Sequence, residues 1–194
     1  MEKLKREDLM SLEKYSEVRS DFRARMIEHK KNRVIRLGPN MSLHFEDRLL
    51  MQYQVQEMLR AEKIFDAAGI QEELGTYNLL IPDGSNLKAT FMIEYSDPQE
   101  RAEALKQLLN VENKIWIKIE GFDKVMPIAD EDLERSTDEK TSSVHFLRFE
   151  FDEKMIEAVK QGKGIGLGVD HPFYQYSVES IAQNHLTSLV SDFD

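Results

Sequence analysis

The chain has 194 residues, of which 41% are hydrophobic and 32% charged, as in a globular protein. It has no cysteine, which excludes disulfides, cysteine-ligated iron–sulfur clusters and cysteine nucleophiles. The net charge of −10 is uneven: residues 1–40 hold 11 Lys/Arg against 7 Asp/Glu, and residues 41–194 hold 15 against 29. Without a signal-like N-terminus or a run of about 18 apolar residues, we expect a cytoplasmic protein with no membrane association.

The first part of the chain predicts helices. Apolar side chains recur at helical spacing over residues 7–31, and a short apolar run at residues 34–37 ends at the turn sequence Gly38-Pro39-Asn40. Ser42 is positioned to cap a second helix, which covers Phe45–Ala68.

The second part of the chain predicts strands alternating with short helices. Strands are expected at residues 89–95, 115–119, 144–151 and 165–169. Helices are expected at residues 97–110, 153–161 and 177–189, and loops at residues 78–86 and 130–141.

This order of elements predicts an α+β fold, with long N-terminal helices packed on a mostly antiparallel sheet of about four to five strands and further short helices. We expect one domain over residues 1–194. Residues 1–40, a basic helix followed by a short strand, could form an appendage to it.

The predicted helix at Phe45–Ala68 carries charged residues inside an apolar pattern, which is costly unless they have partners or a function. Tyr53, Glu57 and Arg60 are spaced to meet on one face, whereas Glu62 lies on the other. Either these residues form a satisfied buried network, or they line a polar pocket that holds an anion or a metal.

Two histidines lie in or after the predicted strands. His145 shares a face with apolar residues, which is typical of a hydrogen-bonded core histidine, and Asp170-His171 follows the last strand, where a turn and a functional site are the alternatives. Nitrogen and oxygen ligands suit zinc, iron or manganese, so a transition metal is a candidate cofactor. The candidate ligands are Glu57, Glu62, Glu94, His145, Asp170 and His171.

Other cofactor motifs are missing from the sequence. No Glu-x-x-His is present, which excludes a ferritin-like di-iron site. The alternating glycines of QGKGIGLGVD, residues 161–170, lie within a predicted strand and match neither a dinucleotide fingerprint nor a P-loop. We therefore expect no haem, iron–sulfur or nucleotide site, and a glycine face that another element or a ligand approaches closely.

The segment FEDRLLMQYQVQEMLRAEKI, residues 45–64, resembles a bacterial family catalogued as domain of unknown function 3501, and the resemblance extends over nearly the whole chain. Further matching positions are Glu73-Leu74, Tyr77-Asn78, residues 80–84, Ala89-Thr90, Ile93-Glu94, residues 144–146 and residues 170–172. We take Tyr77, Asn78 and Glu94, with Tyr53, Glu57 and Arg60, as ligand-binding candidates. The resemblance implies no defined activity, but it implies rubrerythrin-like and iron–sulfur redox proteins as partners.

We therefore expect an accessory or binding protein that acts beside redox or oxidative-stress proteins. The alternative is a metal-dependent enzyme with a Glu/His site. A third hypothesis is phosphate or nucleic-acid binding through the basic residues 19–36, which otherwise form a solvated helix face. Sparse aromatics there and the acidic chain disfavour nucleic acid.

Overall fold

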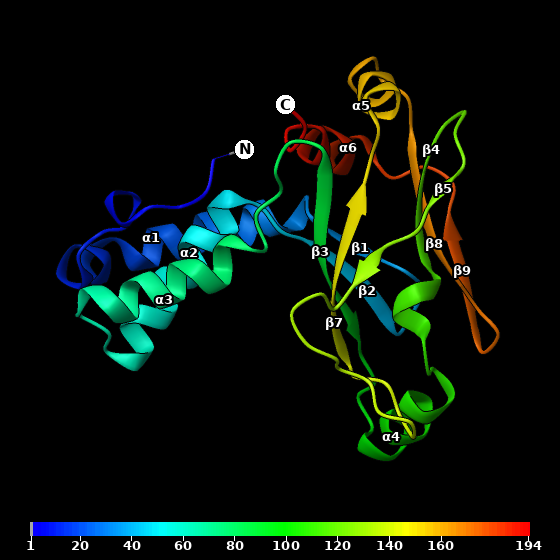
Figure 1. The fold of residues 1–194 in the computed structure, drawn as a ribbon, viewed down its shortest axis with the longest axis horizontal. Helices are drawn as coiled ribbons and strands as arrows, with labels where there is room; N and C mark the ends of the chain where they lie inside the picture. Colours follow the sequence, from blue (N-terminus) through cyan, green and yellow to red (C-terminus); the bar gives the residue numbers. More distant parts are fainter. Residues whose placement is uncertain (1) are drawn as a thin grey trace.

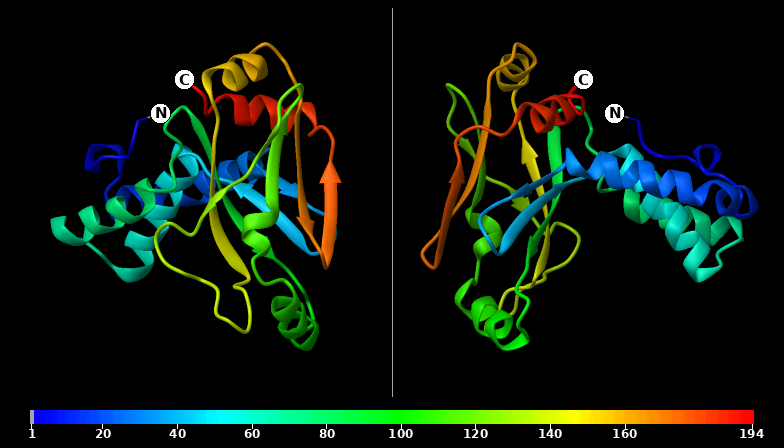
Figure 2. Two further views of the ribbon diagram at one scale, coloured as in Figure 1. Left: turned by 45° about the vertical axis from the view of Figure 1, so that its right-hand side comes forward. Right: turned by 180° about the vertical axis from the view of Figure 1, so that it is seen from behind.

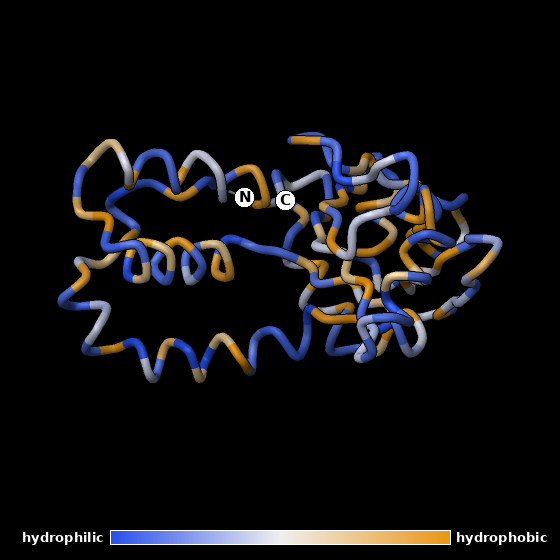
Figure 3. The backbone as a smooth tube through the Cα atoms, turned by 90° about the horizontal axis from the view of Figure 1, so that it is seen from below, coloured by the Kyte–Doolittle hydropathy of each residue, from blue (hydrophilic) through white to orange (hydrophobic). Residues whose placement is uncertain are grey.

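The computed structural model describes residues 2–194, which form a helical lobe and a β-sandwich lobe (Figure 1). Figure 3 shows the helices projecting from one side of the sandwich. The helical lobe contains η1 (Arg6–Asp8), α1 (Leu12–Lys31), α2 (Arg48–Glu62) and α3 (Ala67–Asn78). No helix of the described residues is long and apolar enough to span a membrane.

The sandwich lobe consists of two antiparallel sheets that face each other (Figures 1 and 2). The five-stranded sheet has the order β1 (Val34–Arg36), β2 (Met41–Phe45), β3 (Asn86–Ile93), β7 (Val144–Glu150), β6 (Ile128–Ala129). The four-stranded sheet has the order β5 (Lys124–Val125), β4 (Ile115–Ile119), β8 (Ile165–His171), β9 (Tyr174–Val178).

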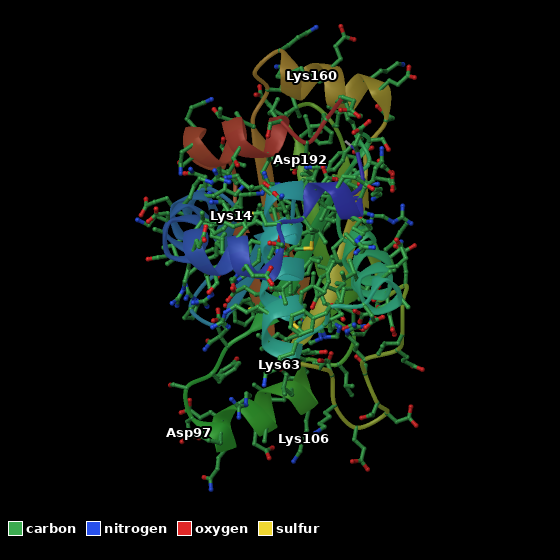
Figure 4. All side chains as sticks on the ribbon, turned by 90° about the vertical axis from the view of Figure 1, so that its left-hand side faces the viewer. Lys14, Lys63, Asp97, Lys106, Lys160 and Asp192 are labelled. Carbon is green, nitrogen blue, oxygen red and sulfur yellow. The ribbon has the colours of Figure 1, made fainter. Side chains whose placement is uncertain are left out.

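Short helices close the ends of the sandwich. They are α4 (Pro98–Gln107), η2 (Val111–Lys114), α5 (Glu153–Lys160) and α6 (Gln183–Val190). Figure 4 places Asp97, the cap of α4, and Lys106 in its last turn at one end of the molecule, and Lys160 of α5 at the opposite end. Leu186 and Leu189 of α6 are buried in the sandwich core, so this helix seals the end that it covers.

The predicted α+β class is confirmed, with antiparallel sheets and a long N-terminal helix. The expected single sheet of four to five strands is instead two sheets of five and four strands. The additional strands are β2, β9 and the two-residue strands β5 and β6. Because β5 and β6 are so short, their sequences carry no periodicity from which a strand can be predicted.

Ser42 lies within β2 and does not cap a helix. The alternation of buried Met41, Leu43 and Phe45 with polar neighbours has the two-residue period of a strand. The cap of α2 is Asp47, whose side chain accepts a hydrogen bond from the amide of Leu50 at 2.8 Å.

The predicted helix over residues 45–68 is shorter than expected and is followed by a second helix. Lys63 adopts a left-handed conformation with φ 56°, which ends α2. Asp66 then caps α3 through the amide of Gly69, at 2.9 Å. The C-terminal helix also begins later than predicted, because residues 174–178 form the edge strand β9.

The glycine face of β8 is closed by an aromatic ring of the neighbouring strand. A Cβ atom at Gly168 would lie 2.5 Å from Cζ2 of Trp116, which is paired with it in the sheet. The expected close approach is therefore made by Trp116 at Gly168 and also by backbone, since a Cβ atom would lie 2.6 Å from the carbonyl of Tyr176 at Gly168 and 2.5 Å from that of Glu179 at Gly166.

Arg33 joins the two lobes. Its side chain is fully buried between the end of α1, the end of β2 and α6. The guanidinium donates to the carbonyls of Phe45 at 3.0 Å and Ser188 at 3.1 Å, and it is paired with Asp192. Burial raises the pKa of Asp192, and the adjacent Arg33 opposes this shift.

The Arg33→Met variant is expected to lower the free energy of unfolding by about 3–5 kcal/mol, because the buried Asp192 then lacks its counter-charge. Urea unfolding monitored by circular dichroism measures the change. The matched control is Arg36→Met, whose side chain is 63% exposed; a change within about 0.5 kcal/mol is expected there. Equal effects of the two variants would contradict a central role for Arg33.

Candidate functional site

A cavity of about 350 Å³ lies where the helical lobe meets the outer face of the five-stranded sheet. This volume is at the lower end of the range for small-ligand pockets. Polar groups reach it from α1, β2, α2, α3 and β3 and from the segments that follow α1 and β2. They are Lys30, Arg33, His44, Glu46, Gln54, Tyr77 and Thr90. Its apolar wall contains Leu50, Met51, Leu80, Met92, Val144 and Phe146.

The alternation of β2 and of the residue after it directs His44 and Glu46 to the outer face of the sheet. Their neighbours Leu43 and Phe45 are buried on the inner face. Thr90 of β3 pairs with His44 in the sheet, and its hydroxyl donates to Glu46 Oε1 at 2.7 Å. The register of two strands therefore assembles the polar side of the cavity.

Burial in the cavity disfavours the charged forms of Glu46 and His44. Burial raises the pKa of Glu46, although the Thr90 hydrogen bond and the charge of Lys30 oppose this shift. Burial also lowers the pKa of His44, against the attraction of Glu94. A protonated Glu46 can donate a hydrogen bond into the cavity, which an ionised carboxylate cannot.

The hydrogen-bond chain beside the cavity determines the tautomer of His44. The Ser42 hydroxyl donates to Glu94 Oε2 at 3.0 Å, and its oxygen lies 3.0 Å from His44 Nε2. Since the hydroxyl proton is directed to Glu94, Nε2–H of neutral His44 is the donor to Ser42. The Nδ1 atom of His44 then remains as an acceptor.

The predicted ligand-binding residues are divided between several places. Tyr77 lines the cavity, and Glu94 is connected to it through Ser42. Asn78 instead forms two hydrogen bonds with the backbone of Leu4, at 2.8 and 2.9 Å, and so holds the N-terminal segment against α3.

The charged group of α2 faces α1, away from the cavity. Glu57 accepts a hydrogen bond from the Tyr15 hydroxyl at 2.6 Å and two from Arg19 at 2.7 Å. These bonds, Arg19 first, lower the pKa of Glu57 to about 2. Tyr53 packs edge-to-face on the ring of Phe22. The main partners of Glu57 are therefore residues of α1, while the expected partners in its own helix, Tyr53 and Arg60, interact with it electrostatically.

Arg60 lies in a separate groove along α1, and Glu62 is exposed at the end of α2. The structure thus separates these two α2 residues from the cavity that Tyr77 lines.

The predicted metal ligands are not brought together. His145 is buried on the inner face of the five-stranded sheet, where Nδ1 lies 2.6 Å from Asp130 Oδ2 and Nε2 2.9 Å from Thr141 Oγ1. His171 belongs to the other sheet, and its Nε2 lies 3.0 Å from the carbonyl of Leu109.

Asp170 is exposed and paired with Lys124 at 2.6 Å. Within residues 2–194, no group of three or more His, Asp or Glu side chains is arranged to hold a metal ion. Each of these two histidines instead has its own hydrogen-bonding partners, which lie in the segments that connect the strands and helices.

The prediction from sequence did not include His44, Glu46, Thr90 and Lys30 as site residues. The signal for the first two was the alternation of residues 41–46, which is a strand pattern with Ser42, His44 and Glu46 on one face. No sequence signal indicates Lys30, because its position at the cavity depends on the packing of α1 against the sheet.

The fold and the cavity define a two-lobed α+β protein with a potential small-ligand site between the lobes. The chain belongs to the family described as protein of unknown function DUF3501, whose model matches residues 3–193. It is similar to the crystal structure of a novel protein of unknown function from Burkholderia pseudomallei K96243, with 46% identity, 100% of both chains covered and a TM-score of 0.94. No curated protein matches the chain.

The Glu46→Gln variant is expected to be more stable than the wild type at pH 7. The pKa of Glu46 is higher in the folded than in the unfolded protein, so ionising this carboxyl at pH values above both pKa values lowers the free energy of unfolding. The neutral amide of glutamine does not ionise and avoids this loss. The advantage is expected to vanish near pH 4, where Glu46 is protonated in both states. Urea unfolding at both pH values measures this difference.

The control for this prediction is Glu134→Gln, at an exposed position of the loop after β6. It is expected to change stability equally little at both pH values. An advantage of Glu46→Gln that is the same at pH 4 and pH 7 would contradict an electrostatic origin.

Proposed function

We propose that the protein is a cytoplasmic accessory protein that binds a small monocarboxylic acid whose remaining part is apolar. The acid binds in the cavity of about 350 Å³ between the two lobes, called the interlobe cavity below. The observation that carries this proposal is the combination of an apolar wall with Glu46, whose raised pKa favours a hydrogen-bond donor inside the cavity. Ligand sites of this kind hold the ligand by apolar contact and orient it by a few polar groups.

The carboxylate class is supported by the donors around the cavity. Lys30 supplies a positive charge at its exposed side, and the raised pKa of Glu46 favours the form that donates a hydrogen bond to an anionic oxygen. The wall formed by Met92, Val144 and Phe146 offers no charge, so the remainder of the ligand is expected to be apolar.

Titration with octanoate or benzoate is expected to shift the methyl signals of Met51 and Met92, which line the cavity, in a protein carrying ¹³C-methyl methionine. Met126 and Met155 are the internal controls, since they lie outside the cavity. The affinity is expected to fall as pH rises through the raised pKa of Glu46, and Glu46→Gln is expected to remove this pH dependence.

A cavity-filling variant tests whether binding occurs at this place. Val144→Trp is expected to abolish the shifts of Met51 and Met92, and Gln54→Phe blocks the cavity from α2 if the first variant is poorly folded. Shifts that persist in a folded variant, or that include Met126 equally, would contradict the proposal. Absence of shifts in the wild type with both acids would contradict it as well.

The accessory role beside rubrerythrin-like and iron–sulfur redox proteins is part of the same proposal and is supported by the family resemblance. A tagged chain produced in its native host is expected to co-purify these proteins, identified by mass spectrometry against an untagged strain. Repeated purification without any redox protein would contradict this role, whatever the cavity binds.

A further inference from the structure

A second polar site lies between α1 and α2, in a groove of about 420 Å³ that shares no residue with the interlobe cavity. Its lining includes two serines and three arginines, namely Ser16, Ser20, Arg19, Arg23 and Arg60. The first four belong to α1, where positions 16, 19, 20 and 23 follow one another at spacings of three, one and three residues, which places them on one side of that helix. Arg60 reaches the groove from α2.

The charges of this groove are not balanced. Glu57 forms a bidentate ion pair with Arg19, in which Nε and Nη2 of Arg19 each donate to a carboxylate oxygen at 2.7 Å. Arg23 and Arg60 form no ion pair with an acidic side chain within the described residues. The charge of Arg60 also helps to lower the pKa of Glu57, so the three arginines of the groove share this one carboxylate. The groove thus carries an excess of positive charge, which an anion would stabilise.

The orientation of the Arg19 guanidinium is fixed by Glu57, which is in turn fixed by Tyr15. Glu57, itself bonded by Tyr15, occupies two of the five N–H donors of Arg19. The remaining donors are carried by a guanidinium that is already fixed in orientation, so less side-chain entropy is lost when an anion binds. Glu57 is therefore a positioning residue for Arg19.

We propose that this groove binds the phosphoryl group of a small phosphorylated molecule. Guanidinium groups match the tetrahedral oxygens of a phosphoryl group through paired N–H donors, and the hydroxyls of Ser16 and Ser20 add neutral donors at the same groove. Ala24 and Ile27 continue the groove past the arginines and offer an apolar surface to the rest of the ligand.

A small ligand is favoured over nucleic acid by the composition of the surroundings. The net charge of the chain is −10, which repels a long polyanion. The aromatic residues of α1, Tyr15 and Phe22, are buried and cannot stack on bases. The groove thus concentrates positive charge over a short length.

Calorimetric titration with inorganic phosphate and phenyl phosphate at low ionic strength tests the proposal on the full chain. The wild type is expected to bind phenyl phosphate at or below about 1 mM, an affinity typical of a few charge-assisted hydrogen bonds. The double variant Arg23→Gln/Arg60→Gln is expected to weaken binding by about tenfold or more, since it removes two charged donors to the phosphoryl group and leaves Arg19.

The matched control is Arg25→Gln/Lys31→Gln, which removes the same charge from α1 outside the groove. Its affinity is expected to stay within about threefold of the wild type, because distant exposed charges are screened. An equal loss in both double variants, or no binding by the wild type at 10 mM phenyl phosphate (about ten times the expected dissociation constant), would overturn the proposal.

A DNA duplex added as a third probe distinguishes the source of the phosphoryl group. Tighter binding of the duplex than of phenyl phosphate, with a steep loss on adding salt, would overturn the small-molecule proposal in favour of nucleic acid. The methionine signals of the interlobe cavity report separately on the carboxylate proposal, so either site can fail without the other.

Discussion

The buried guanidinium of Arg33 is the interaction on which the relation between the two lobes depends. It reaches the carbonyls of Phe45 and Glu46, at 3.0 and 3.2 Å, and pairs with Asp192 from the C-terminal segment. Asp47 lies 3.3 Å from the same side chain and also caps α2. A single buried cation therefore fixes the direction in which the chain leaves β2 and enters α2, and this direction places α2 beside the sheet.

The interlobe cavity is a consequence of that junction. Glu46 lies between the last residue of β2 and the cap of α2, so its backbone is held by Arg33 while its side chain points to the outer face of the sheet. Moving α2 would open the cavity to water and remove the desolvation that raises the pKa of Glu46. The chemistry of the site is thus coupled to the packing of the lobes.

The two polar sites differ in their electrostatic character for a structural reason. The cavity lies between a sheet and helices, and burial there lowers the pKa of His44 and raises the pKa of Glu46, which disfavours charge on both. The groove lies on exposed helix surfaces, where Arg23 and Arg60 keep their charge in contact with water. The first is therefore suited to an apolar ligand with one polar group, and the second to a compact anion.

The sequence by itself determined the α+β class, most of the later elements and the placement of His145 on an apolar strand face. It did so because local periodicity and helix caps such as Asp97 act within a few residues. The alternation of Met41, Leu43 and Phe45 also indicates strand β2. This signal is missed because Ser42 is assigned as the cap of the helix that follows.

Only the tertiary structure decided which charges meet. Arg33 and Asp192 are 159 residues apart, and Glu57 and Arg19 are 38 apart. A partner at such a separation is selected by the packing of whole helices and strands, and no spacing along the chain encodes it. For the same reason the sequence indicated charged residues on α2 but not that α1 would bind Glu57 and leave Arg60 in an unbalanced groove.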